Sequence, residues 1–251
     1  MLYYYHYGEG KETLVILHGL LGAAKNWQQI ATAFAKDRQV LCFDLPNHGG
    51  SCHQTDMRYE FIAEQIHSQL QALGINKIQL LGHSLGGKLA MVMADLYPKL
   101  VSHLVVVDIA ARHYPDEHSH IIQALMQLPL DNHSRKALDL SLATTIKEKK
   151  IRQFLLMNLV HRSGKWHWQV NLHNIWHAYS YLISAIPERS HLLSYQVLVI
   201  HAVNSTYIEE KDLQALRVRY PNMQAIEFNT GHWVQHDASA AFVTTVNDFL
   251  S

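Results

Sequence analysis

Residues 80–90 carry the clearest pattern with chemical meaning. In this stretch, LLGHSLGGKLA, Ser84 lies two residues after Gly82 and two residues before Gly86. An apolar run ends at His83 and a helix-like segment follows the serine at once, which predicts a sharp strand-to-helix turn. Glycines at the flanking positions let the strand and the helix approach closely, so the hydroxyl is left exposed as a candidate nucleophile.

The stretch LVILHGLLG, residues 14–22, predicts a strand that runs into a glycine turn. A serine that attacks a carbonyl produces a tetrahedral oxyanion, and fixed backbone N–H groups stabilise such a charge. The N–H of Leu20 in this turn and the N–H of Leu85, directly after the predicted nucleophile, fit that role. The alternative is an ordinary glycine turn with no part in catalysis.

A histidine near the C-terminal end of the chain is the candidate base. Residues 229–236, NTGHWVQH, follow the last apolar run and place His232 in a loop after a glycine. Histidine has the pKa needed to take a proton from a serine and to return it. The position of His232 also gives the chain order serine, acid, histidine. His236 is the nearest alternative.

The turn at residues 204–206 raises the question of the acid. It reads Asn-Ser-Thr at a point where one common kind of hydrolase carries an aspartate. Glu209 stands three residues after Thr206, which is the spacing of a capping box at the start of a helix. The acidic residues after the turn therefore have a structural explanation, and Glu209, Glu210 and Asp212 also stay candidates for the acid.

The elements that must position these residues alternate along the chain. Short runs of Val, Ile and Leu predict strands covered on both faces, and amphipathic segments between them predict the covering helices. This pattern favours an α/β fold with a mostly parallel sheet. The opening stretch, residues 2–7, predicts an antiparallel edge strand. The predicted parallel strands occupy residues 14–17, 39–44, 78–83, 104–110, 196–202 and 223–228.

The alternation stops between residues 112 and 190, where apolar residues have helical spacing in the segments 121–128, 134–146, 150–160 and 172–186. We therefore expect one core domain, formed by residues 1–111 and 191–251, with a helical cap inserted before the last strands. An insertion between two strands emerges where parallel strands end, and such sheets bind ligands at that edge. The Trp and Tyr residues of the cap are either pocket walls or the cap's own core.

Composition excludes several classes of partner. The 251 residues contain 21 Lys and Arg against 21 Asp and Glu, so no overall charge favours nucleic acid or anionic lipid. A neutral small-molecule substrate is expected. The chain shows neither a secretory signal nor an apolar run long enough to cross a membrane, which predicts a cytoplasmic protein. Cys42 and Cys52 are expected to be thiols rather than a disulfide.

Nineteen histidines raise the possibility of a metal site. His173 and His177 would share one face of a helix at a spacing of four residues, as metal ligands can. Position 174 is Asn, so the glutamate of the zinc-protease helix is absent, and no Cys or acidic cluster supplies a third ligand nearby. We expect no metal and no other cofactor.

Six motifs carry a resemblance to a known family: DLPNHGGS, GHSLGGK, VVVDIA, RQFLL, NSTY and GHWV. The chain resembles the α/β-hydrolase superfamily over nearly its whole length, and within it is similar to the small YbfF-type esterases. Pro46 departs from the pattern, in which an arginine usually precedes Asn-His-Gly. The resemblance implies the α/β-hydrolase fold and a Ser-His-Asp carboxylesterase that needs no cofactor and favours short acyl esters or thioesters.

The resemblance also implies that Asp108, in VVVDIA, is the acid. In these esterases the acid follows the strand next to the nucleophile strand. Neighbouring parallel strands lie about 5 Å apart and end at the same edge of the sheet, so Asp108 is expected near the site. The alternative is that Asp108 caps the following segment.

The predicted function is a serine hydrolase that cleaves short acyl esters through an acyl-enzyme intermediate. Ser84 attacks, His232 moves the proton, Asp108 orients the imidazole, and the amides of Leu20 and Leu85 hold the oxyanion. One alternative is the same fold acting on a thioester, a lactone or a carbon–carbon bond. The other is a catalytically silent binding protein.

Overall fold

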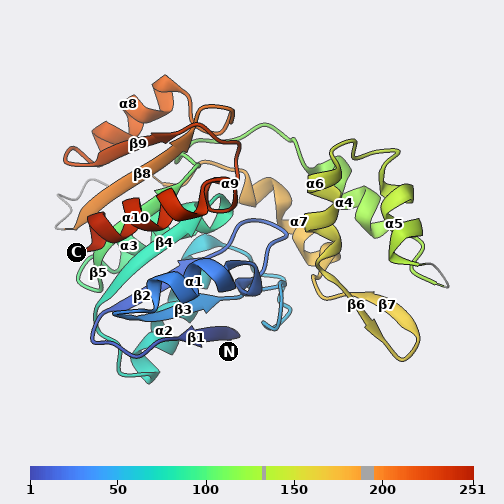
Figure 1. The fold of residues 1–251 in the computed structure, drawn as a ribbon, viewed down its shortest axis with the longest axis horizontal. Coiled ribbons are helices and arrows are strands. Elements are labelled where there is room, and N and C mark those ends of the chain that lie inside the picture. Colours follow the sequence, from blue (N-terminus) through green and yellow to red (C-terminus); the bar gives the residue numbers. More distant parts are fainter. Residues whose placement is uncertain (132–133, 188–194) are drawn as a thin grey trace.

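A seven-stranded sheet forms the centre of the molecule (Figure 1). The structure is a computed structural model that describes residues 1–131, 134–187 and 195–251. The strand order is β1-β3-β2-β4-β5-β8-β9; β1 pairs with β3 in antiparallel fashion and all other pairs are parallel. The predicted parallel sheet and edge strand are confirmed. The strands are β1 (Tyr4–Tyr7), β2 (Thr13–Leu17), β3 (Gln39–Phe43), β4 (Ile78–His83), β5 (Val101–Val107), β8 (Gln196–Ala202) and β9 (Gln224–Phe228).

Helices cover both faces of the sheet because successive side chains of each strand point to opposite sides. Leu14 and Ile16 of β2 pack with α1 and α10, whereas Val15 and Leu17 pack with α2, α3 and α8. Figure 1 shows α1 and α10 together on one face. Each such buried side chain contributes about 1.5–3 kcal/mol. The helices are α1 (Gln28–Phe34), α2 (Tyr59–Ala72), α3 (Leu85–Leu96), α8 (Glu210–Arg219), α9 (Val234–Asp237) and α10 (Ser239–Leu250), with a 3-10 helix at Ala24–Trp27.

The register of the central strands brings their carboxyl ends to one edge. His83, the last residue of β4, pairs with Val107, the last residue of β5, and Val107 pairs with Ile200 of β8. Ser84 and Asp108 follow directly after β4 and β5. Both residues therefore leave the sheet at the same edge, on neighbouring strands.

The segment between β5 and β8 forms a separate layer beside that edge (Figure 1). We call its described part, residues 112–131 and 134–187, the insertion; the predicted boundary at 190 and 191 lies outside the described residues. It contains the predicted helices, and its own core of apolar side chains includes Leu138, Leu155 and Ile175. Its elements are α4 (Ser119–Met126), α5 (Arg135–Leu142), α6 (Lys149–Leu156), β6 (Leu159–Arg162), β7 (Lys165–Trp168) and α7 (Leu172–Leu182).

One prediction for the insertion was wrong. The helix predicted to continue to residue 160 ends at Leu156, and an antiparallel hairpin of β6 and β7 follows it. Ser163 and Gly164, between the two strands, have φ angles of 50° and 79°. Positive φ at both central residues is typical of the two-residue turn whose twist matches the right-handed twist of the flanking strands. This turn therefore favours the pairing of β6 with β7.

None of the helices in residues 1–131, 134–187 and 195–251 combines the length and the apolar character that crossing a membrane requires.

Candidate active site

Ser84 stands on a strained turn between β4 and α3. Its φ and ψ angles are 53° and −121°, a conformation that side-chain-bearing residues rarely adopt. A Cβ on Gly82 would lie 2.1 Å from the carbonyl oxygen of Gly86, and a Cβ on Gly86 would lie 2.3 Å from that of Leu17. Only glycine fits at these two positions, which is the close approach that the sequence pattern predicts.

Asp108 occupies the matching position after β5 and is fully buried. Its φ angle is 48°, and its N–H donates to the carbonyl of Ile200 over 2.8 Å. The carboxylate accepts three hydrogen bonds, from the N–H of Ala202 at 3.1 Å, from the hydroxyl of Ser205 at 2.5 Å and from His232 Nδ1 at 2.7 Å. A carboxylate satisfied in this way holds the imidazole in one orientation.

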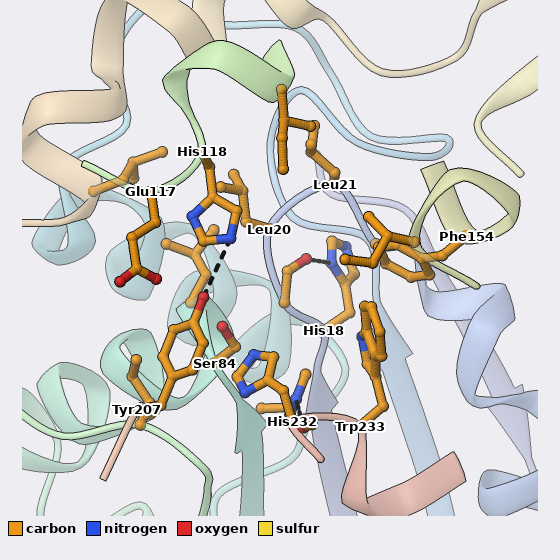
Figure 2. Close-up of a pocket in the computed structure, with 18 of the residues that line it drawn as sticks. His18, Leu20, Leu21, Ser84, Glu117, His118, Phe154, Tyr207, His232 and Trp233 are labelled. Atoms are coloured by element: carbon orange, nitrogen blue, oxygen red, sulfur yellow. Dashed lines mark hydrogen bonds between the residues drawn. The ribbon is translucent and has the colours of Figure 1, made fainter. Parts of the chain in front are cut away.

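His232 reaches the same edge from the loop after β9 (Figure 2). Nδ1 contacts Asp108, and the ring lines the same cavity as Ser84. The ring of Tyr207 stacks on the imidazole, with centroids 4.0 Å apart and planes inclined by 17°. His236, the alternative base, also lines the cavity, but the carboxylate of Asp108 contacts His232 instead.

Leu20 lies in a loop after β2 that buried polar groups hold in place. The N–H of Leu21, a residue with a φ angle of 57°, donates to Nε2 of His48 over 3.1 Å. His18 Nε2 accepts from the N–H of Leu45 at 3.0 Å. The sequence placed Leu20 and Leu85 as the oxyanion donors, and both line the same cavity as Ser84.

The two histidines behind this loop are neutral acceptors. Burial lowers the pKa of His18 to about 4 and that of His48 to about 3. The carboxylate of Asp44 accepts from the N–H groups of Ala24 at 2.7 Å and Gly50 at 2.8 Å, and burial raises its pKa. In the sequence, residues 44–51 stand out only as one of the motifs of the family resemblance. In the structure they support the loop that carries Leu20.

These residues surround a cavity of about 460 Å³ between the sheet edge and the insertion. The core domain contributes Trp27 and Trp233, and α6 contributes Phe154, which lies 5.5 Å from Trp233 between ring centroids (Figure 2). The predicted aromatic residues of the insertion divide into two groups. Tyr179 lines the cavity and also belongs to the insertion's own core, whereas Trp166, Trp168 and Trp176 only pack against that core.

His118, a polar residue of the insertion that the sequence did not single out, also lines the cavity. His118 of the insertion accepts or donates through both ring nitrogens, to Tyr207 Oη at 3.2 Å and to Tyr179 Oη at 3.4 Å. Burial lowers its pKa to about 4, so the ring is neutral. No local motif marks His118, because its partners come from α7 and from the turn after β8.

The acidic residues after β8 form structural contacts at the start of α8, and the predicted capping box was wrong. The box at the start of α8 joins Glu209 and Asp212, not Thr206 and Glu209, because the helix begins at Glu210. Asp212 also forms an ion pair of 2.9 Å with Arg112. The turn at 204–206 contributes to the site in another way, since its Ser205 donates to the buried carboxylate of Asp108.

His173 and His177 do meet on one face of α7, with 3.1 Å between their Nε2 atoms. Across the described ranges, no group of three His, Cys, Asp or Glu side chains is arranged to hold a metal ion. Cys42 is buried and Cys52 exposed, and both are free thiols, as predicted.

Comparisons with known proteins agree with this geometry. The family model of the alpha/beta hydrolase fold matches residues 12–163. The chain is 35% identical to the sn-1-specific diacylglycerol lipase ABHD11 of Mus musculus, over 98% of this chain and 84% of that protein. It is 28% identical to esterase YbfF of Escherichia coli K12, over 95% and 92% of the two chains.

A solved structure of a marine microorganism esterase superimposes with a TM-score of 0.95 at 31% identity, covering 99% of this chain and 98% of that one. The predicted superfamily, the resemblance to YbfF-type esterases and the enzyme class, a carboxylic ester hydrolase, are confirmed. With the glycine-flanked serine after β4 and the matched family model, the chain belongs to the α/β-hydrolase family.

Proposed function

We propose that the protein hydrolyses short acyl esters through a covalent acyl-enzyme. The Ser84 oxygen attacks the ester carbonyl while His232 Nε2 takes its proton, and Asp108 stabilises the imidazolium that forms. The N–H groups of Leu20 and Leu85 stabilise the oxyanion. His232 then gives the proton to the leaving alcohol, and a water molecule, activated by the same imidazole, releases the acid.

The contact of 2.7 Å between His232 Nδ1 and Asp108 Oδ2 carries this proposal. It fixes which nitrogen faces the cavity into which Ser84 also points (Figure 2). A structural histidine would not need a fully buried carboxylate, because burying a charge is costly unless the charge is used or fully paired.

The cavity supports an ester of modest size as substrate. Its walls expose mostly apolar surface, from residues such as Trp27, Leu21, Ile121 and Phe154. The relatives named above include an esterase and a lipase, whose substrates are esters. We propose that the insertion acts as a cap that encloses the acyl chain, together with the core of residues 1–111 and 191–251.

Labelling with a fluorophosphonate tests the nucleophile directly. Wild-type protein should be labelled and should cleave p-nitrophenyl acetate, whereas Ser84→Ala should lose the label and several orders of magnitude of turnover. Ser141→Ala, which changes an exposed serine on α5, is the matched control. A labelled or fully active Ser84→Ala variant would exclude this mechanism, and an unlabelled wild type would favour a silent binding protein.

A further inference from the structure

A buried lysine connects the nucleophile helix to both ends of the insertion. Lys88 lies in the first turn of α3 with 1% of its surface exposed. Its backbone N–H donates to the carbonyl of Ser84 over 3.2 Å. Its ammonium donates to the carbonyls of Arg112 at 2.9 Å, Ile183 at 3.3 Å and Ser184 at 2.5 Å.

The three carbonyls belong to the two segments by which the insertion leaves and rejoins the core. We call these segments, residues 111–114 and 183–186, the stalk. They are bonded to each other, since the N–H of Tyr114 donates to Ile183 at 2.8 Å and the N–H of Ile186 donates to Ala111 at 2.9 Å. The ammonium of Lys88 therefore binds both segments of the stalk at one point.

The chemistry of the group suits a fixed anchor. An ammonium has three donors, and here three carbonyl oxygens accept them. The face of the Tyr114 ring lies 4.8 Å from Nζ and adds a cation–π contact. Burial, with the nearby charge of Arg112 as a second cause, lowers the pKa of Lys88 to about 7.

We propose that Lys88 is a positioning residue that sets the distance between the insertion and Ser84. Lys88 is hydrogen-bonded both to the backbone of Ser84 and to the two ends of the insertion. Loss of the ammonium should let the stalk open and move the wall that carries Phe154 away from the acyl chain. The activity part of this inference rests on the proposed function; the structural part does not.

Amide hydrogen exchange and ester kinetics on Lys88→Met test the inference. Exchange at the stalk amides of Tyr114 and Ile186 should become at least about tenfold faster, while the amides of the β4 and β5 ladder keep their rates. The kcat/KM ratio for p-nitrophenyl hexanoate should fall about tenfold more than that for p-nitrophenyl acetate, mainly through KM. Lys36→Met, at an exposed position of the core domain, is the matched control.

Each outcome decides the matter. Stalk exchange at the wild-type rate in a folded Lys88→Met variant overturns the proposal, and so does an equal loss for both esters. If the methionine variant does not fold, Lys88→Gln replaces it. Its shorter side chain has two N–H donors for three carbonyls, so stalk exchange should still become faster, by a smaller factor, and exchange at the wild-type rate overturns the proposal. If stalk exchange is faster in Lys88→Met but the wild-type protein has no esterase activity, the anchoring role of Lys88 stands and the proposed function is overturned instead.

Discussion

The catalytic edge of the sheet and the insertion are held by different kinds of interaction. Ser84 and Asp108 both take positive φ angles, yet the N–H of each donates to the neighbouring strand, at 3.0 Å and 2.8 Å. The insertion instead has its own apolar core, and it joins the core domain through apolar side chains such as Leu182 and through polar groups. One of these is Asn158, whose Nδ2 donates to the carbonyl of Leu21 at 2.7 Å. The residues proposed to react thus lie at the edge of the sheet, and the wall proposed to contact the substrate lies on the insertion.

Asp108→Asn changes the edge of the sheet and is expected to have the largest effect on turnover. The neutral amide keeps the shape but no longer stabilises the imidazolium, so turnover should fall roughly 10⁴-fold, as the equivalent change does in a serine protease, in a protein that stays folded. Glu209→Gln, at the exposed start of α8, should stay active. Ester turnover beside a thermal melt checks both, and a dead Glu209 variant with an active Asp108 variant would move the acid to the turn after β8.

A pair of glycine substitutions compares the two regions directly. Gly82→Ala would place a Cβ 2.1 Å from backbone oxygen, and the elbow cannot yield without breaking the ladder, so unfolding free energy should drop by at least about 3 kcal/mol. Gly164→Ala in the hairpin of the insertion meets no atom within 4 Å and should cost only about 1–2 kcal/mol, from its positive φ. Urea unfolding of both variants gives the comparison, and equal losses would contradict it.

The difference between the two regions also explains what the sequence could predict. All six predicted parallel strands are present, because continuous Val, Ile and Leu runs have few other uses than a sheet covered on both faces. The serine turn could be placed to the residue, since its glycines are imposed by contacts within a few residues of each other. The strand predicted at 104–110 was placed three residues too late; β5 spans Val101–Val107 and ends there because Asp108 takes a positive φ.

Side-chain partners from distant segments could not be predicted in this way. Ser205 donates to Asp108 across 97 positions of sequence, and His118 lies 89 positions from Tyr207. Periodicity carries no information about such pairs. The hairpin of β6 and β7 was missed for another reason, since its Ser-Gly turn at 163 and 164 was a local signal that the helical spacing of the preceding residues obscured.

The smallest effect is expected from the wall of the insertion. Phe154 packs against Trp233 in the wall of the cavity, and it is carried by α6 rather than by the sheet. Phe154→Ala removes apolar contact with an acyl chain that reaches the insertion, but it leaves the groups around Ser84 in place. The kcat/KM ratio should therefore fall about tenfold, or about 1.4 kcal/mol, for p-nitrophenyl hexanoate and less for the acetate, with the change in KM. Leu140→Ala, an exposed apolar residue on α5, is the control. An equal loss for both esters would mean that the insertion helps to hold the catalytic edge itself, and that the two regions are not as separate as their contacts indicate.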